Sequence, residues 1–561
     1  MPTIDLKIAR LEKLLGRKLN LKQLEYDLQW IGLAIDRTDE EAGIIKIEYE
    51  PNRPDFSSPE GVARALRGYY GIELGLKNYE VNPGSVDFIV DAKVKQIRPY
   101  CLGAVIRNIA LDDDEVATLM NIQEQLHWML GRDRRKVAIG VHDFDKVVPP
   151  FRYTTVGPEE IRFRPLQMER YEMTPKEILE EHPKGIAYKW ILEGMSSFPI
   201  IFDKNNDVLS FPPIINGILT AVTDQTKNLF LDMTGTDERA VSRAMNILVT
   251  CLADMGAKIE SVKMHYEDSS EIRISPDLTP STWTTHVDYI NDMLGLKLTR
   301  AEVIKYLEKT RFGAFPGKRK NEVQVLVPAY RTDILHEVDF TEEVAMGYGY
   351  QNLPLTFREG GVGKYHPLLM LGSRLRQIMV GAGYQEMVNF TLTNSKREFE
   401  YMHALTTKDK LLQLRNPVSL EYDTTRSTLL PSLLYNVQFN IHEEKPINIF
   451  EVGDVIILAP EEETGARRVG KIAAITCSQD AEFTHIRSVF DFLCTCLGVL
   501  EKIEVKPTDH PSYLQGRTGD IYAYGNKVGI IGEINPEVLT NFQIGFPVAA
   551  FEMFIEWLLT K

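Results

Sequence analysis

Hydrophobic and polar positions change their spacing many times along the chain, and each change predicts the start of another element. At the beginning of the chain the pattern predicts a strand, two helices and a second strand, the last three over residues 9–15, 22–31 and 43–49. Two prolines then make a rigid turn, and a helix that starts at Pro59 follows, with Ser57 or Ser58 able to cap it. Residues 1–84 are therefore expected to form a small α+β module.

Residues 85–267 alternate strand-like and helix-like patterns. The strands are expected at residues 86–90, 103–109, 136–141, 198–202 and 229–233. Strands mixed with helices in this way predict a mixed α/β domain.

In residues 268–354, helices are expected over residues 284–294 and 299–309, and a strand over residues 322–328. Helix, turn, helix and strand in this order suggest a winged-helix-like unit. Its basic residues alternate with acids, so a DNA-binding role ranks low.

Residues 355–561 open with a long helix pattern over residues 368–382. Antiparallel strands are then expected at residues 386–392, 447–457, 471–476, 520–524 and 527–534. Two more helices are expected at residues 427–440 and 484–497. A chain of 561 residues is long enough for three to four domains, and we expect an α+β multidomain protein divided into these four parts.

Composition narrows the class of protein. The chain has 44% hydrophobic and 25% charged residues, which is ordinary for globular proteins, but its net charge is −15. A general nucleic-acid binder that relies on counterion release is therefore excluded. A local basic patch could still contact a phosphate backbone, although a charge run is usually a solvated face. The candidate patch consists of Arg132, Arg134, Arg135 and Lys136.

Cysteine usage indicates a reducing compartment. The five cysteines are odd in number and form no Cys-x-x-Cys pair, so neither a disulfide framework nor a zinc site is indicated. The N-terminus lacks the basic and apolar pattern of a secretory signal, and no apolar run is long enough to span a membrane. A cytoplasmic location is expected.

Carboxylates are clustered most densely in the predicted helix over residues 338–348. Asp339, Glu342 and Glu343 have i, i+3 and i+4 spacing, which places them on one helix face, and a loop could bring Asp333 to the same place. Spacing alone leaves two interpretations open. The acids could be solvated groups that complement the helix dipole, with Asp339 near the cap. They could instead bind Mg²⁺, which prefers oxygen ligands.

The whole string over residues 328–350, Pro-x-x-Arg-x-Asp-Ile followed by Asp-x-x-Glu-Glu-Val-Ala and Tyr-Gly-Tyr, closely resembles the beta subunit of phenylalanyl-tRNA synthetase of the archaeal and eukaryotic type. In that family the four matching acids hold Mg²⁺ near the junction with the alpha subunit. Asn-Arg-Pro-Asp at residues 52–55, followed by Ser-x-Glu-Gly-x-Ala-Arg, is typical of the same beta subunit. For Arg53 and Asp55 we expect an ion pair that fixes the loop rather than a catalytic role.

Two further strings, at residues 209–216 and 229–237, contain hydroxyl and carboxylate groups beside Gly and Pro turns. Such groups can orient a polar ligand, or they can be turn formers that bond their own backbone. The strings resemble the editing domain of archaeal and eukaryotic phenylalanyl-tRNA synthetases, which hydrolyses tyrosine wrongly attached to the tRNA. The resemblance implies a pocket lined by Leu209, Ser210, Asp232 and Thr234.

The C-terminal part resembles the catalytic fold of class II aminoacyl-tRNA synthetases, and its strings at residues 416–433 and 450–453 are again typical of the beta subunit. Class II enzymes grip ATP with an arginine paired with an acid on one strand and with a late Glu-Arg. Phe-Glu-Val-Gly at residues 450–453 lacks the arginine, and residues 516–520 lack the Glu-Arg. This part is therefore expected to be a degenerate, non-catalytic domain.

The resemblance implies a heterotetramer of two alpha and two beta subunits that joins phenylalanine to tRNA(Phe) with ATP. ATP and phenylalanine would be bound mainly by the alpha subunit, while this chain would supply scaffold, Mg²⁺, tRNA contacts and editing. One alternative is a stand-alone Mg²⁺-dependent phosphotransfer enzyme, but no phosphate loop or general base accompanies the acids. Another is an inert scaffold or tRNA-binding module without editing activity.

Overall fold

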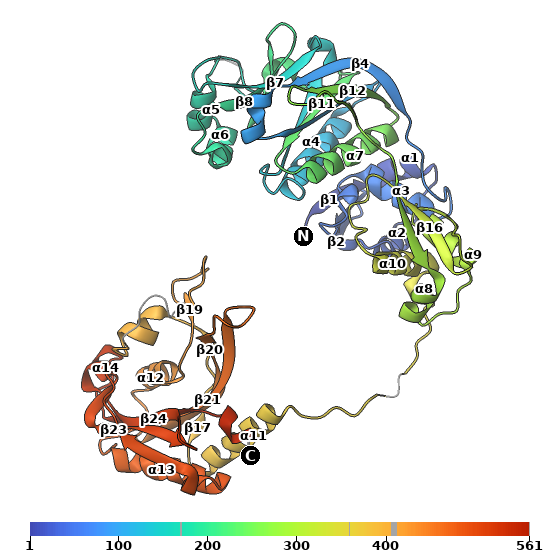
Figure 1. The fold of residues 1–561 in the computed structure, drawn as a ribbon. Coiled ribbons are helices and arrows are strands. Elements are labelled where there is room, and N and C mark those ends of the chain that lie inside the picture. Colours follow the sequence, from blue (N-terminus) through green and yellow to red (C-terminus); the bar gives the residue numbers. More distant parts are fainter. Residues whose placement is uncertain (169–170, 358–359, 405–411, 560–561) are drawn as a thin grey trace. The chain divides into compact units, whose positions relative to one another are not determined.

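The computed structural model describes residues 1–168, 171–357, 360–404 and 412–559 (Figure 1). The chain divides into two compact units, residues 1–356 and residues 357–561. The finer division into four parts stays a prediction. Among the described residues, no helix combines the length and the apolar character that a membrane crossing requires.

The first unit begins with the expected α+β module. Its three-stranded antiparallel sheet has the order β1-β3-β2 and is covered by three helices. The bounds are β1 (Thr3–Lys7), α1 (Ile8–Leu15), α2 (Leu21–Trp30), β2 (Ala34–Asp39), β3 (Ile44–Glu48) and α3 (Pro59–Tyr69). Ser58 caps α3, because its side chain accepts a hydrogen bond from the Gly61 N–H, and Pro59 takes the first helical position as predicted.

A ten-stranded mixed sheet dominates the rest of the first unit. Nine strands follow the order β10-β9-β8-β7-β4-β12-β5-β11-β6, and β13 (Ile272–Ser275) pairs with β12. Their bounds are β4 (Val81–Val90), β5 (Tyr100–Arg107), β6 (Val137–Asp143), β7 (Phe151–Val156), β8 (Phe198–Phe202), β9 (Val208–Phe211), β10 (Ile215–Asn216), β11 (Leu229–Gly235) and β12 (Lys258–Tyr266). The sheet curves, so that its two edge strands meet: Asn216 in β10 donates a hydrogen bond to the Val141 carbonyl in β6 at 3.4 Å.

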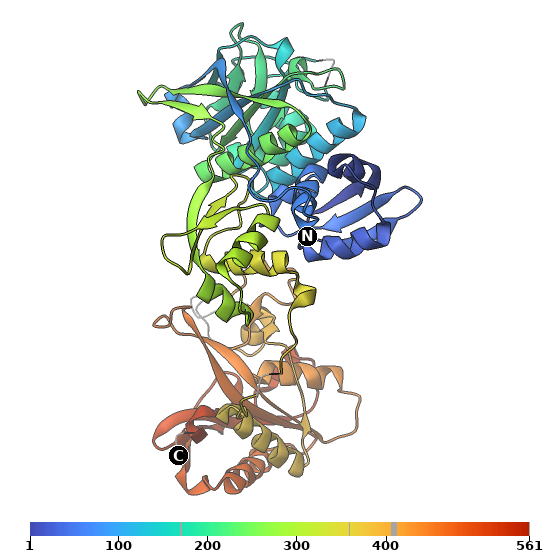
Figure 2. The ribbon, with the colours of Figure 1, turned by 90° about the vertical axis from the view of Figure 1, so that its right-hand side faces the viewer.

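Helices cover this sheet on one face. Helices α4 (Asp113–Trp128) and α7 (Glu238–Asp254) lie against the same face (Figures 1 and 2). Leu126 of α4 and Leu248 of α7 share a buried core with Leu231 and Met233 of β11. The short helices α5 (Pro175–Glu181) and α6 (Pro183–Tyr188) lie near the other end of the strand order, where Ile178 packs with Phe198 and Phe211.

The last part of the first unit contains a three-stranded antiparallel sheet of order β14-β16-β15 and three helices. Its elements are β14 (Ser281–His286), α8 (Val287–Leu294), α9 (Arg300–Lys309), β15 (Gly313–Pro316), β16 (Glu322–Val327) and α10 (Glu337–Tyr348). The helix expected over residues 284–294 is therefore shorter, since its first three residues end a strand. Phe312 and Phe340 pack edge to face in the core.

The second unit is a seven-stranded sheet of order β17-β20-β21-β25-β24-β23-β22, antiparallel except for the pair β17 and β20. Helices α11 and α13 cover one face and α12 and α14 the other. The strands are β17 (Gln385–Glu386), β20 (Ile447–Leu458), β21 (Ala466–Cys477), β22 (Ile503–Pro507), β23 (Tyr513–Ala523), β24 (Asn526–Ile534) and β25 (Val548–Phe554). The helices are α11 (Pro367–Gly381), α12 (Leu430–Phe439), α13 (Phe483–Leu497) and α14 (Pro536–Asn541).

One expected strand of the second unit is wrong in its bounds. Residues 386–392 form only the ends of two short strands, β17 and β18 (Leu392–Thr393), with an irregular segment between them. Val388 and Phe390 in that segment are 87% and 76% exposed, so the apolar pattern that suggested a buried strand faces solvent in this chain.

Candidate functional site

Two of the four residues implied for the editing pocket line a cavity of about 450 Å³ in the curved ten-stranded sheet. Ser210 lies in β9 and Asp232 in β11, which are far apart in the strand order. They reach the same cavity because the curvature brings the β10 edge of the sheet against the β6 edge. Volumes of roughly 300–1,000 Å³ are typical of small-molecule sites.

A buried chain of hydrogen bonds holds the Asp232 carboxylate. Its Oδ2 lies 2.6 Å from Nε2 of His142, and Nδ1 of the same ring lies 2.8 Å from the Thr220 hydroxyl. All three residues are at most 1% exposed. Because a carboxylate accepts hydrogen bonds, Nε2 carries the ring proton that faces Asp232. Asp232 is thereby fixed in one orientation at the cavity wall.

Gly140 makes this arrangement possible. It faces Asp232 across the β6 and β11 ladder. A Cβ atom at this position would lie 1.9 Å from Asp232 Oδ2 and 2.6 Å from His142 Nε2, which is too close for any side chain. A glycine is needed here for space and not for its backbone angles.

The other two residues implied for the pocket lie beside the cavity and are not among the described residues that line it. Leu209 points into the core of the curved sheet, with Phe151 and Phe230 as neighbours. Thr234 contacts Arg98, which donates to its carbonyl at 2.9 Å and to its hydroxyl at 3.4 Å. Successive side chains of a strand point to opposite faces, so Leu209 faces away from the cavity that the next residue, Ser210, lines.

His127 is a cavity residue that sequence reasoning missed. Its Nε2 accepts a hydrogen bond from the Ile139 N–H at 2.8 Å, so a neutral ring carries its proton on Nδ1. Among the described residues this Nδ1 has no hydrogen-bond partner. Burial, with further contributions from Arg134 and Lys184, holds the pKa of His127 well below its usual value. The ring is therefore neutral and has one N–H free to donate.

The candidate basic patch is only partly on the surface. Arg132, Asp133 and Arg134 all have left-handed backbone angles, with φ of 49°, 53° and 66°. This turn directs Arg134 inward, where it is 7% exposed and donates to the carbonyls of Pro213 and Ile214. The expectation of a phosphate contact is therefore corrected for Arg134. Arg132 and Arg135 are exposed, and Lys136 is half-buried.

The four predicted metal ligands lie on α10 and the loop before it, and two of them are already paired with a cation of the protein. Arg331 forms ion pairs with Asp333 at 2.6 Å and with Glu343. Burial alone would raise the pKa of Asp333, but the charge and hydrogen bonds of Arg331 lower it below its usual value. Asp339 accepts hydrogen bonds from the Leu335 and His336 N–H groups through Oδ2, as the third residue of the capping box of α10, which agrees with the alternative that places it near the cap.

Two features of the acidic cluster still fit a bound cation. Oε2 of Glu343 is buried and has no hydrogen-bond partner among the described residues. Burial and the neighbouring carboxylates of Glu343 and Asp333 raise the pKa of Glu342, which shows that negative charge accumulates there. Within the described part of the chain, however, no group of three or more His, Cys, Asp or Glu residues is arranged to hold a metal ion.

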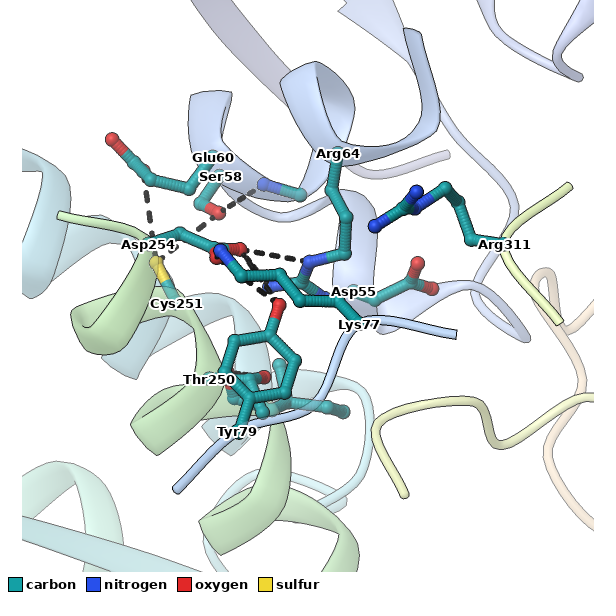
Figure 3. Close-up of polar contacts among 12 residues, drawn as sticks. Asp55, Ser58, Glu60, Arg64, Lys77, Tyr79, Thr250, Cys251, Asp254 and Arg311 are labelled. Atoms are coloured by element: carbon teal, nitrogen blue, oxygen red, sulfur yellow. Dashed lines mark hydrogen bonds and ion pairs between the residues drawn. The ribbon is translucent and has the colours of Figure 1, made fainter. Parts of the chain in front are cut away.

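The string at residues 52–64 forms a junction rather than a catalytic site. Arg53 and Asp55 make a bidentate ion pair at 2.9 and 2.8 Å, as expected. Arg64 reaches from α3 to Asp254 at the end of α7, and the pair is 2.6 Å apart (Figure 3). Lys77 at 2.6 Å and the Tyr79 hydroxyl at 3.1 Å contact the same carboxylate.

In the second unit, the two strings that resemble the beta subunit meet in a buried ion pair. Arg426 contacts Glu451 at 2.6 Å, and both side chains are 3% exposed. Gly453 leaves room for the pair, because a Cβ there would lie 2.5 Å from the Arg426 guanidinium.

The helix expected over residues 427–440 is observed as α12, and most of its apolar side chains face inward. Leu430, Leu433, Leu434 and Val437 are buried in the core. Exposed apolar residues are found instead in residues 388–392 and 414–422, which we call the apolar strip. Its most exposed members are Val388, Phe390, Val418 and Leu420.

Comparison with known proteins gives matches along most of the chain. Residues 355–555 match the family model of the phenylalanyl tRNA synthetase beta chain CLM domain. Residues 283–350 match the tRNA synthetase B5 domain, and residues 99–249 match the B3/4 domain. The cavity and its hydrogen-bonded chain lie within the B3/4 match, and the acidic cluster lies within the B5 match.

Full-length relatives are also similar. The phenylalanine-tRNA ligase beta subunit of Methanosarcina barkeri is 44% identical over 555 residues, covering 99% of this chain and 98% of that protein. The beta subunit of Methanocaldococcus jannaschii is 40% identical over 560 residues, covering 99% and 100%. Among solved structures, an N-terminal fragment of the phenylalanyl-tRNA synthetase beta subunit from Pyrococcus horikoshii is 38% identical with a TM-score of 0.59, covering 62% of this chain and 99% of the fragment.

Proposed function

Because this chain belongs to the family of phenylalanine-tRNA ligase beta subunits, we propose that it assembles with an alpha subunit and removes tyrosine wrongly attached to tRNA(Phe). Charging of tRNA(Phe) with phenylalanine, using ATP, takes place on the alpha subunit of a two-alpha, two-beta assembly. The editing reaction takes place in the cavity that Ser210 and Asp232 line.

The observation that carries the editing proposal is the fixed Asp232 carboxylate. Phenylalanine and tyrosine differ by one hydroxyl, and a site that hydrogen-bonds a hydroxyl rejects the analogue that lacks it far more strongly than an apolar pocket rejects an added one. Asp232 is held by His142 and Thr220 and borders the cavity, so it accepts a hydrogen bond from the substrate with little reorganisation. Ser210, whose hydroxyl donates to Asn216 at 3.2 Å, is the second polar contact.

The reaction is ester hydrolysis. A water oxygen attacks the carbonyl carbon of the aminoacyl ester, the bond from that carbon to the ribose oxygen breaks, and a water proton ends on the ribose oxygen. No covalent enzyme intermediate is assigned, since the Ser210 hydroxyl donates to the Asn216 side-chain oxygen and not to a base. The free Nδ1–H of His127 offers a donor to an acceptor oxygen of the substrate.

Asp232→Asn in the assembled complex tests this proposal. The amide keeps the size of the side chain but removes the charge, so deacylation of tyrosyl-tRNA(Phe) should slow by at least about tenfold, a change worth roughly 1.4 kcal/mol in the barrier. Phenylalanine charging should stay near normal. Asp207→Asn, on an exposed turn just before β9, is the matched control. If Asp232→Asn deacylates tyrosyl-tRNA(Phe) at the rate of the unchanged chain, the editing proposal is wrong and an inert scaffold describes this domain better.

The same proposal includes the contact with the alpha subunit, the contact with the tRNA and the location of the complex. The apolar strip is the contact surface for the alpha subunit, since such exposed apolar area is typical of obligate partners. Arg132, Arg135 and Lys136 contact the tRNA backbone. The location of the complex is the cytoplasm.

Mg²⁺ is proposed for the acidic cluster. The residues that would hold it are Asp333, Asp339, Glu342 and Glu343, and the ion would supply positive charge where carboxylates repel one another. Support comes from the unpartnered Oε2 of Glu343 and from the raised pKa of Glu342. Arg331 is the competing cation for Asp333 and Glu343.

A further inference from the structure

The second unit contains a cavity that the proposed function does not use. It has a volume of about 420 Å³ and lies over the sheet face that α12 covers. Its floor comes from β21, β24 and β25, and its sides come from residues 398–404, from the segment before α12 and from residues 510–513. Apolar walls surround it, including Phe399, Met402, Met553 and Phe554.

Two buried polar groups of this cavity have unused hydrogen-bonding capacity. Glu398 is 1% exposed, and its Oε1 accepts three hydrogen bonds, from the Ser427 N–H, the Ser427 hydroxyl and the Thr428 N–H. Its Oε2 has no partner among the described residues, and neither has the hydroxyl of Tyr513, which is 3% exposed. A buried polar atom without a partner costs free energy, so two of them beside one cavity point to a missing ligand.

Among the described residues that line the cavity, carboxyl groups are buried more deeply than any cation. Glu398 and Glu552 are both buried, whereas Lys471 is partly buried, with an 11% exposed side chain, and is paired with Glu552 at 2.5 Å. Lys527 is half-exposed and pairs with Asp520 at 2.7 Å. His510 carries no charge near neutral pH, because burial and then Lys527 lower its pKa below the usual value.

We propose that this cavity binds a small ligand with a primary ammonium group and an apolar body, such as an aryl-substituted amine or an apolar amino acid. An ammonium has three N–H donors, which the free oxygens of Glu398 and Tyr513 can accept. The apolar body would pack against the aromatic and methionine side chains of the walls.

The protonation of Glu398 follows from the same geometry. Burial raises the pKa of Glu398 to about 7, against the three donors that contact its Oε1. An ammonium requires the ionised carboxylate, so binding releases a proton below neutral pH. Affinity should therefore rise roughly tenfold from about pH 6 to about pH 8 and then level off. Glu552, Lys471 and Lys527 line the same cavity.

Calorimetric titration of the full-length chain tests the proposal with three probes. These are 2-phenylethylamine, L-phenylalanine and 3-phenylpropionate, which has no amine. The two ammonium compounds should bind with heats that depend on the ionisation enthalpy of the buffer, because a proton leaves. The ratio of the affinities of L-phenylalanine and 2-phenylethylamine shows whether a carboxylate next to the ammonium adds affinity. This comparison distinguishes an amino-acid ligand from an amine ligand. The compound without the amine should bind at least about tenfold more weakly.

Variants locate the binding to this cavity. Glu398→Gln keeps an acceptor oxygen for Ser427 and Thr428, and it should lower the affinity for 2-phenylethylamine by about tenfold or more. Tyr513→Phe removes a hydroxyl that has no partner among the described residues, so the fold should be unaffected while binding weakens. Glu443→Gln changes an exposed acid of the same unit and should leave the binding of the probes normal.

The proposal is overturned if no probe binds at millimolar concentration, or if 3-phenylpropionate binds as well as the amines. It is also overturned if Glu398→Gln and Tyr513→Phe, both folded, bind like the unchanged chain. None of these outcomes depends on the editing proposal, because the two cavities share no residue.

Discussion

Replacing Asp254 by alanine should loosen the contact between α3 and α7. In the folded chain this carboxylate accepts from Arg64, Lys77 and Tyr79. Arg64 is 5% exposed and cannot turn to water, so its charge would remain buried without a partner, which costs about 3–5 kcal/mol. Lys77 is 35% exposed at its side chain and adds little. The loss corresponds to an increase of roughly two to four orders of magnitude in the opening equilibrium of the junction.

Native-state hydrogen exchange followed by mass spectrometry measures this change. Peptides from α3 and α7 should exchange faster by that factor, while peptides from β20 and β21 in the second unit serve as the internal control. The double variant Arg64→Met with Asp254→Leu removes both buried charges, and it should exchange more slowly than Asp254→Ala.

The same pair makes the junction sensitive to acid. Burial alone would raise the pKa of Asp254, but Arg64 and Lys77 lower it below its usual value. A carboxyl with a lowered folded pKa contributes stability above its unfolded pKa, near 4, and loses it as the pH falls through the folded pKa. Asp254→Ala should abolish this acid sensitivity. Exchange within a few-fold of the unchanged chain, or a double variant less protected than the single one, would refute the electrostatic account.

Other changes probe the remaining sites. Gly140→Ala should slow deacylation of tyrosyl-tRNA(Phe) without affecting phenylalanine charging, because the new methyl group would displace Asp232 from His142; equal rates in a deacylation assay would contradict this. Glu342→Gln should lower the Mg²⁺ content of the assembled complex, measured by elemental mass spectrometry, with Glu443→Gln as the control acid. Phe390→Asp should weaken association with the alpha subunit on a sizing column, whereas Leu434→Met, inside the core of α12, should leave it intact.

Local sequence patterns predicted those elements whose residues act on their near neighbours. The cap of α3 by Ser58 and the ion pair of Arg53 and Asp55 are both confirmed, because each depends on spacings of two or three residues. Strand β2 was missed because its residues are mostly exposed, so the sequence contains no clear alternation to mark it.

The candidate site depended on contacts that no local pattern contains. Ser210 and Asp232 share a cavity only because the sheet curves. His142 lies in a strand that is buried at every position, so the pattern of the strand does not mark it as a functional residue. The basic run at residues 132–136 resembled a solvated surface, since arginines are mostly exposed. Three consecutive left-handed residues reversed that expectation for Arg134, and such a conformation is rare enough outside glycine that a sequence gives no warning of it.

The meeting of the two edge strands beside the cavity has a mechanical consequence. The strand order runs from β10 to β6, and in the described part of the chain no ladder joins these two ends. Side chains fasten them instead, through the Asn216 amide and through Arg134, which holds the carbonyls just before β10. Separating the two edges breaks only a few hydrogen bonds, each worth about 1 kcal/mol, and does not require two paired strands to come apart. The cavity thus has a seam that opens at a lower cost than a paired edge would, while the rest of the sheet stays intact.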